Sequence, residues 1–259
     1  MFRDRFHTRA KACGVLAMAL LAPLLVVILP TSAAGTQADQ TDALPDLRMR
    51  RMTSFSIEST TDDRKLLRFP TVIVNAGSGR FDVRGYRPST SVSTMTTRQR
   101  IYDTEGGHRS VATDAVMYFA GDGHSHWHVR DLNRYNLYRV GGGPRVGTGA
   151  KHGFCFYDNT TYNLALPGAP SSPYYRGCGD SDNLGVMMGL SVGWGDTYSA
   201  SLRDQYIDVT GLPDGDYRLA AEADASSWFL ESDKSNNKAV TVIRIAGSNV
   251  TVLRVKSGA

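Results

Sequence analysis

The chain has 259 residues, of which 41% are hydrophobic and 21% charged, with 29 Lys and Arg against 25 Asp and Glu. Residues 1–34 carry four basic side chains and one acidic one, so the remainder holds 25 against 24, a net charge of about +1. This balance gives no reason to expect nucleic-acid binding. The part after residue 34 is long enough for one well-packed core or two small ones.

The N-terminal segment predicts a secretory signal peptide. Four basic residues within positions 3–11 precede an apolar run from about Val15 to Leu29, and Ser32-Ala33-Ala34 offers small residues for cleavage. We therefore expect residues 1–34 to be removed and the protein to be secreted, with no membrane association afterwards. The alternative is an uncleaved anchor, for which the apolar run is short.

Residues 35–43 are polar and are expected to form a disordered linker before one domain over residues 44–259. In that domain short β-branched segments alternate with turn residues, and no segment has a long apolar period of 3.6 residues. Strands are predicted at 65–77 with a turn at its end, 99–103, 115–121, 126–140, two within 205–224 around a turn at 213–215, 238–245 and 249–255. The pattern predicts an all-β fold, a single β-sandwich-like domain with long loops.

Two cysteines, Cys155 and Cys178, remain once the signal peptide with Cys13 is removed. In an exported protein they predict one disulfide, which would contribute about 3 kcal/mol to stability. The alternative is a pair of free buried thiols. A disulfide here would pin the long turn-rich loop over residues 160–179.

Three of the six histidines, His124, His126 and His128, occupy every second position of the stretch GHSHWHVRD. On a strand they share one face, where neutral imidazoles can bind copper or zinc. The outer Cα atoms of a flat strand lie about 13 Å apart, so the strand must curve, and Gly121 and Gly123 would permit a bulge. No cysteine joins the group, which argues against a structural thiolate zinc site. The motif alone does not choose the metal, and three solvent-facing histidines are the alternative.

A series of motifs in a fixed order, from about residue 44 to residue 245, resembles the lysyl oxidase family. Each motif is weak alone, and their shared order is the strong signal. They are the histidine triplet followed by Asp131 and Tyr135-Asn-Leu137, Lys151-His-Gly-Phe154-Cys155, Gly193-Trp-Gly-Asp196-Thr-Tyr198, Ile207-Asp208-Val-Thr with Pro213-Asp-Gly215-Asp-Tyr217, Glu231-Ser-Asp233-Lys-Ser-Asn236-Asn237, and upstream Pro45-Asp46-Leu47 and Leu66-Leu67-Arg68-Phe69.

The sequence also departs from the animal members of that family. Gly123 stands where they have a cysteine, only two cysteines remain after the signal peptide, and the interval from Lys151 to Tyr198 is longer. These differences indicate a simpler, bacterial-type relative.

The resemblance implies a copper-dependent amine oxidase. Copper would be bound by the three histidines, and Lys151 and Tyr198 would become a cross-linked quinone, lysine tyrosylquinone. Such an enzyme uses O2 to convert primary amines, of small molecules or of protein lysines, to aldehydes with release of hydrogen peroxide and ammonia. A buried Lys151 is expected, because burial favours the neutral amine that the cross-link needs. Asp131 and Asp196 are candidate general bases or hydrogen-bond partners of the site.

A second metal site is predicted near the C-terminus, where oxygen ligands that suit Ca²⁺ cluster within seven residues. The set consists of Glu231, Asp233, Asn236 and Asn237, and the resemblance adds the Asp46 side chain and the Leu47 carbonyl. The alternative is an ordinary polar turn.

Three other functions remain open at this point. One is a non-catalytic copper- and calcium-binding β-sandwich module, against which the presence of both Lys151 and Tyr198 argues. Another is a zinc hydrolase that uses the three histidines. The weakest is a cupin-like barrel, which needs a further histidine from a distant strand, with only His108 and His152 available.

Overall fold

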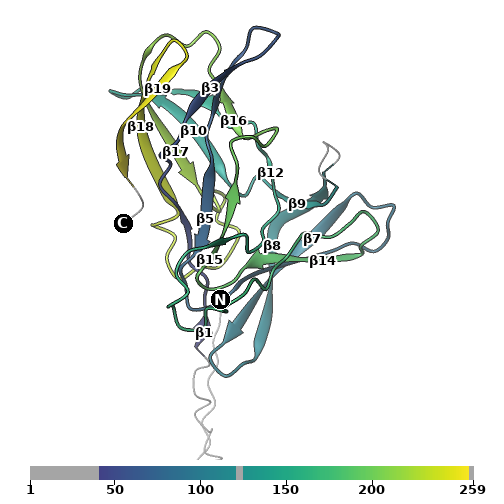
Figure 1. The fold of residues 1–259 in the computed structure, drawn as a ribbon. Coiled ribbons are helices and arrows are strands. Elements are labelled where there is room, and N and C mark those ends of the chain that lie inside the picture. The colour runs from purple at the N-terminus through teal and green to yellow at the C-terminus, as the bar shows by residue number, and fades with distance from the viewer. Residues whose placement is uncertain (1–40, 121–124, 257–259) are drawn as a thin grey trace, which may run out of the picture. The chain divides into compact units, whose positions relative to one another are not determined.

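The computed structural model describes residues 41–120 and 125–256. The expected signal peptide, His124 and the glycines at 121 and 123 lie outside these residues. The described chain consists of strands, turns and loops without a helix, which confirms the predicted all-β fold (Figure 1). No helix in the described part is long and apolar enough to cross a membrane.

Every strand pairing within residues 41–120 and 125–256 is antiparallel, and the strands described there form four sheets. The seven-stranded sheet has the order β12 (Gly153–Phe154), β9 (Trp127–Arg130), β8 (His108–Phe119), β7 (Thr94–Asp103), β6 (Phe81–Tyr86) and β14 (Gly185–Leu190), with β1 (Asp42–Ala43) paired to β7. The five-stranded sheet has the order β11 (Arg145–Thr148), β10 (Arg134–Arg139), β17 (Gly215–Glu222), β18 (Lys238–Ala246) and β19 (Asn249–Lys256).

The two smaller sheets hold the remaining strands. The four-stranded sheet has the order β13 (Thr160–Thr161), β15 (Trp194–Tyr198), β5 (Thr71–Asn75) and β2 (Leu47–Met49). The three-stranded sheet has the order β16 (Tyr206–Asp208), β4 (Lys65–Arg68) and β3 (Ser56–Ser59).

One continuous cluster of buried apolar side chains holds these sheets together. The strands that contribute to it alternate buried and more accessible positions, as in β18, because one face of each packs inward. Phe69 packs edge-on against Tyr135 of β10 with ring centroids 5.5 Å apart, and the Tyr135 hydroxyl bonds the Thr71 hydroxyl of β5 at 2.9 Å. The five-stranded sheet therefore packs on the β4 and β5 strands, as in a sandwich.

Two predicted strands are each interrupted, which corrects their boundaries. The segment 65–77 divides into β4 and β5 at Pro70, whose nitrogen cannot donate a ladder hydrogen bond. The segment 126–140 divides into β9 and β10 at Asp131, which has a φ of 50° and donates its N–H to the His152 carbonyl at 2.6 Å. That turn carries the chain from the seven-stranded sheet into the five-stranded one.

The segment expected to be a disordered linker, 35–43, is partly ordered. Its last two residues, Asp42 and Ala43, form β1 and pair with Asp103 and Tyr102 of β7. The Asp42 carboxylate also contacts the Arg109 guanidinium on β8. Backbone pairing and this ion pair fix a stretch whose composition alone predicts disorder.

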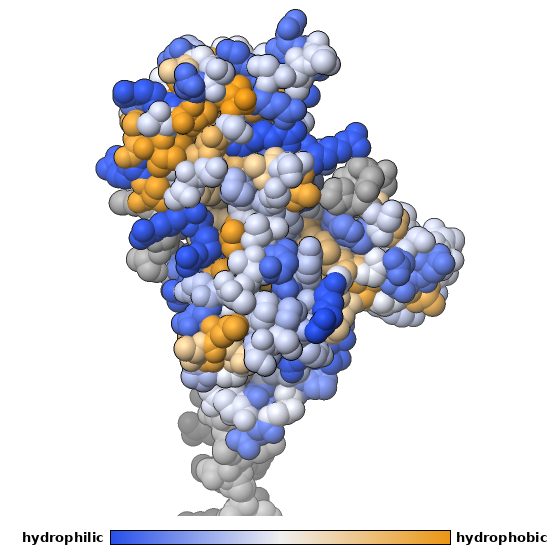
Figure 2. Space-filling model, viewed as in Figure 1, coloured by the Kyte–Doolittle hydropathy of each residue, from blue (hydrophilic) through white to orange (hydrophobic). Residues whose placement is uncertain are grey.

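Apolar side chains also reach the surface. On the face shown in Figure 2 they gather mainly over the five-stranded sheet. Leu253 of β19 is 44% exposed, whereas Val250 and Val252 of the same strand are partly buried against the core. The alternation along β19 therefore resembles that of a sheet with one face in the core.

Candidate active site

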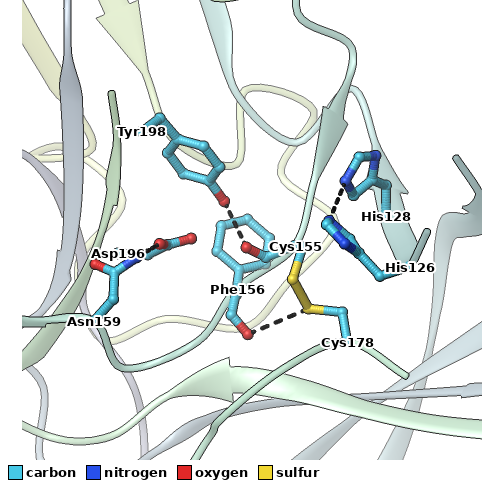
Figure 3. The surroundings of a disulfide bond; sticks show 8 residues. All are labelled: His126, His128, Cys155, Phe156, Asn159, Cys178, Asp196 and Tyr198. Atoms are coloured by element: carbon cyan, nitrogen blue, oxygen red, sulfur yellow. Dashed lines mark hydrogen bonds between the residues drawn. A yellow bond between two sulfur atoms is a disulfide. The ribbon is translucent and has the colours of Figure 1, made fainter. Parts of the chain in front are cut away.

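The two described histidines of the triplet point at each other. His128 lies on β9, and His126 precedes that strand by one residue. Their Nε2 atoms are 2.9 Å apart (Figure 3), while Trp127 between them is buried on the opposite side and donates its indole N–H to the Asp180 carbonyl. The period-two prediction thus holds for this pair, and His124 stays a prediction.

The imidazole of His128 has room only because residue 153 is a glycine. Gly153 of β12 pairs with Arg130 of β9, and a Cβ at Gly153 would lie 2.4 Å from His128 Nδ1 and 2.3 Å from the Tyr118 hydroxyl. Tyr118 of β8 stands opposite His128 in the ladder, with their rings edge to face. The backbone of β12 therefore forms one wall of the histidine site.

Tyr198 and Asp196 come from β15, in a different sheet. They are two residues apart, so both face the same side of the strand, as predicted. Tyr198 is 5% exposed and donates its hydroxyl to the Cys155 carbonyl at 2.9 Å. Burial, reinforced by the neighbouring Asp196, raises the pKa of Tyr198 well above its usual value.

Asp196 is the more unusual carboxyl group of the site, with 1% of its surface exposed. Burial raises its pKa to about 7, although the neighbouring Tyr198 hydroxyl, the hydrogen bond from Asn159 and the charge of Lys151 act in the opposite direction. Asn159 bonds Oδ1, whereas the buried Oδ2 accepts no hydrogen bond from any residue that the structure describes. No motif in the sequence marks Asn159 as part of the site.

Lys151 reaches the same place from the segment between β11 and β12. It is 8% exposed, and its Nζ lies 5.2 Å from the ring centroid of Tyr198 and 5.3 Å from that of Phe154. Two residues 47 positions apart in the sequence are therefore neighbours in the fold.

The disulfide connects the two halves of the site. Cys155 and Cys178 are bonded, with Cα atoms 5.8 Å apart, and Figure 3 shows the bridge between the histidines and the Asp196–Tyr198 pair. The Cys178 carbonyl accepts the Trp127 N–H at 3.1 Å, and the Cys155 carbonyl accepts the Tyr198 hydroxyl. The bridge thus links β9 to β15 through a short series of bonds.

These side chains share one cavity of about 290 Å³. Its lining includes His126, His128, Lys151, Asp196 and Tyr198. Tyr157 and Leu202 also line it, and the sequence motifs do not point to either of them. Two imidazoles, an amine, a carboxyl group and a phenol thus meet in one half-enclosed space.

The second candidate base, Asp131, lies elsewhere. Its carboxylate contacts His152 Nδ1 at 2.5 Å, and both side chains are exposed. It lines a neighbouring cavity and not the one that contains Tyr198. Of the two carboxylates, only Asp196 is placed beside the tyrosine.

The histidine pair fits a metal ion with nitrogen ligands. Two nitrogens bound to one ion at about 2.0 Å each and at right angles lie about 2.8 Å apart, close to the observed Nε2 separation of 2.9 Å. Among the residues described, no three His, Cys, Asp or Glu side chains come together as a metal-binding group. A third ligand would come from His124, outside those residues, or from another kind of donor.

Some residues of the predicted calcium site are hydrogen-bonded to one another, although its three carboxylates do not form a metal-binding group among the residues described. Glu231 accepts the Leu47 N–H at 2.7 Å and the Asn237 amide at 2.9 Å, and the Asn236 amide bonds Asp233 at 3.0 Å. Burial raises the pKa of Glu231 to about 8.

Three oxygens of this cluster are buried without a hydrogen bond from any described residue. They are Asp46 Oδ1, Asn236 Oδ1 and Asn237 Oδ1. Unpaired buried oxygens are costly, and a hard cation would satisfy them. These oxygens are of the types that suit Ca²⁺, although the other carboxylate oxygen of Asp46 is paired with the Arg48 guanidinium.

Comparison of the sequence with known proteins identifies its family. The sequence model of the lysyl oxidase family matches residues 101–255, more than half of the chain. The chain belongs to the lysyl oxidase family. Human Lysyl oxidase homolog 1 is 31% identical over 136 residues, covering 51% of this chain and 21% of the relative. Protein-lysine 6-oxidase of Sus scrofa is 32% identical over 125 residues, covering 48% and 45%, and human Lysyl oxidase homolog 2 is 28% identical over 181 residues, covering 70% and 18%. The chain thus spans less than half the length of these relatives.

The role of Gly153 yields a first prediction. Gly153→Ala should displace the His128 ring and weaken copper(II) binding by about tenfold or more, since the Cβ meets a ring and a hydroxyl packed in a rigid ladder. Gly177→Ala is the matched control, because its Cβ would meet no atom within 4 Å. Competition titration with a copper chelator measures the copper affinity of each variant. Equal copper affinities for the two variants would contradict the prediction.

Proposed function

We propose that this domain is a copper-dependent amine oxidase that converts primary amines to aldehydes through a quinone made from Lys151 and Tyr198. The observation that carries the proposal is the 5.2 Å separation of the Lys151 Nζ from the Tyr198 ring centroid, in a cavity that also holds two imidazoles. The general test is release of hydrogen peroxide by copper-loaded protein across a panel of primary amines.

When present, copper and a quinone derived from Tyr198 would supply the redox chemistry, with O2 as the oxidant. His126 and His128 would hold the copper, with His124 as the third ligand. The remaining task of the chain is to bring Lys151 to the ring, and the fold does so by burying both side chains in one cavity. The neutral amine of Lys151 is the form able to add to a ring carbon.

Asp196 is suited to remove the proton from the carbon next to the substrate amine. A base works best when its pKa is close to the working pH, and that of Asp196 is raised to about 7. Its Oδ2 has no donor among the described residues, which leaves a lone pair for this proton. Asn159 holds the other carboxylate oxygen and fixes the orientation of the group.

We further propose that Ca²⁺ binds Asp46, the Leu47 carbonyl, Glu231, Asp233, Asn236 and Asn237. The unpaired buried oxygens of Asp46, Asn236 and Asn237 support this site. Such an ion would tie the N-terminal strand β2 to the segment before β18.

The substrate and location belong to the same proposal. The substrate is a primary amine, of a small molecule or of a protein lysine, and O2 is the second substrate. Residues 1–34 would direct secretion. The Cys155–Cys178 disulfide would be stable in the oxidising environment outside the cell.

The cross-link gives the most direct test. A digest of protein matured with copper and O2 should contain one Lys151–Tyr198 cross-linked peptide, and protein made without copper should contain the two linear peptides. Lys151→Arg should bind copper and remain inactive, because a guanidinium does not deprotonate to attack the ring. Linear peptides with active amine oxidation would overturn the mechanism, and linear peptides with no oxidation would favour a non-catalytic metal-binding module.

The pKa of Asp196 predicts the pH dependence of the reaction. The base must be ionised, so kcat/KM should rise with pH through about 7 and level off above it. Asp196→Asn should lower kcat by about 10²- to 10⁴-fold and remove this step. Asp216→Asn, which changes an exposed carboxylate paired with Arg244, should retain it. A step near pH 7 that persists in Asp196→Asn would assign the base to another group.

Calcium should stabilise the domain by binding only its folded state, by about 2.7 kcal/mol at a concentration of 100 Kd. A calcium chelator should therefore lower the thermal midpoint, and magnesium should not restore it. Asn236→Ala should abolish the effect of calcium on the thermal midpoint. Asn249→Ala, which changes an exposed residue of β19, should leave this effect intact. If the thermal midpoint of the unsubstituted protein does not change with calcium, the site is excluded.

A further inference from the structure

A second cavity, of about 310 Å³, adjoins the active-site cavity. Lys151 lines both, so the two meet at this side chain. The walls of the second cavity come from the β9–β10 turn, from β11 and from the segment before β18. They include Asp131, Asn133, Arg134, Arg145, His152 and Trp228.

Asn133 is the first sign that this cavity binds a ligand. It is 4% exposed and forms no hydrogen bond of ordinary geometry with any residue that the structure describes, although it lies beside the Tyr135 hydroxyl, whose pKa it acts to lower. Buried amides are almost always paired, because an unpaired one has lost its water without compensation. A ligand in the cavity that Asn133 lines would provide the missing partner.

The charge of the cavity indicates an anionic ligand. Arg134 forms no hydrogen bond or ion pair with any described residue, and Arg145 has only a long contact of 3.4 Å with Asn136. The one carboxylate, Asp131, is engaged by His152 at 2.5 Å. Two guanidinium groups therefore line a space that contains one carboxylate, which is already engaged by His152. Guanidinium groups bind planar or tetrahedral anions such as carboxylate and phosphate, and carboxylate is the one that an amine substrate commonly carries.

We propose that this cavity is a subsite for the carboxylate of the amine substrate. Arg134 and the Asn133 amide bind the carboxylate, Trp228 flanks the methylene chain, and the amine extends past Lys151 toward Tyr198. The substrate class is then an amine separated from a carboxylate by several methylene groups, either an ω-amino acid or a lysine beside an acidic residue in a peptide. The effect of this subsite on enzyme kinetics rests on the proposed amine oxidation. The binding of the carboxylate itself does not.

Binding is tested first, on copper-free protein, with 6-aminohexanoate as the probe and n-hexylamine as the probe without a carboxylate. Calorimetric titration should show 6-aminohexanoate binding at least about tenfold more tightly. Arg134→Ala should remove about that tenfold preference, and Arg145→Ala should reduce it. Arg254→Ala on β19, outside the cavity, matches the change in net charge and should leave it intact.

Kinetics on copper-matured protein then locate the subsite relative to the reaction. Arg134→Ala should raise KM for 6-aminohexanoate with little change in kcat, and should leave KM for n-hexylamine as it was. A series from 3-aminopropanoate to 8-aminooctanoate should show an optimum length in the unsubstituted protein that disappears in Arg134→Ala. Peptides with lysine beside glutamate or glutamine distinguish a peptide substrate from a free amino acid.

The two proposals fail in different ways. If no amine is oxidised but 6-aminohexanoate binds in an Arg134-dependent manner, amine oxidation is wrong and the anion subsite stands. If amines are oxidised but the two probes bind equally, or Arg134→Ala and Arg254→Ala behave alike, the subsite is wrong.

Discussion

The whole site depends on one residue, Cys155, that holds two sheets together. His128 belongs to the seven-stranded sheet and Tyr198 to the four-stranded one, so nothing in either sheet alone fixes their separation. The Cys155 carbonyl accepts the buried Tyr198 hydroxyl, and its sulfur bonds Cys178, whose carbonyl holds the backbone of Trp127 between the histidines. Because β12 precedes Cys155 and pairs with β9, the same segment also sets the wall against which His128 packs.

Burial gives the site its chemistry at a cost in stability. Asp196 has a pKa of about 7 because it is withdrawn from water, and its Oδ2 lacks a donor among the described residues. The same imbalance occurs at Asn133 and in the group of Asp46, Asn236 and Asn237. Unpaired buried polar atoms destabilise a fold by about 1–3 kcal/mol each, a cost that a ligand bound at the proposed sites would offset.

Features of the fold that follow from local periodicity were predictable from the sequence. Features that depend on the turn between β9 and β10 were not. The strands over 238–245 and 249–255 follow from alternating apolar residues, and the shared orientation of Asp196 and Tyr198 follows from their spacing. The break at Asp131 was missed because an aspartate with positive φ leaves no clear signal in a run of strand-forming residues. That break also explains why Asp131, equal to Asp196 as a candidate base in the sequence, lies in the neighbouring cavity. Asn159 could not be found, because its contact with Asp196 spans 37 residues and exists only in the fold.

The backbone around Lys151 shows how the fold prepares this side chain before any covalent link forms. Gly149 donates to the Tyr135 carbonyl, Ala150 donates to the Tyr206 carbonyl, and the His152 carbonyl accepts the Asp131 N–H. These three partners lie on β10, on β16 and at the end of β9, in three different sheets. The main chain on both sides of Lys151 is therefore fixed, and only the side-chain torsions remain to be chosen. Since a reaction between held groups avoids most of the entropy cost of bringing them together, attack on the Tyr198 ring requires only a short approach within one cavity. The same fixed position makes Lys151 the boundary between the two cavities, so a substrate held in the proposed subsite would pass this side chain to reach Tyr198.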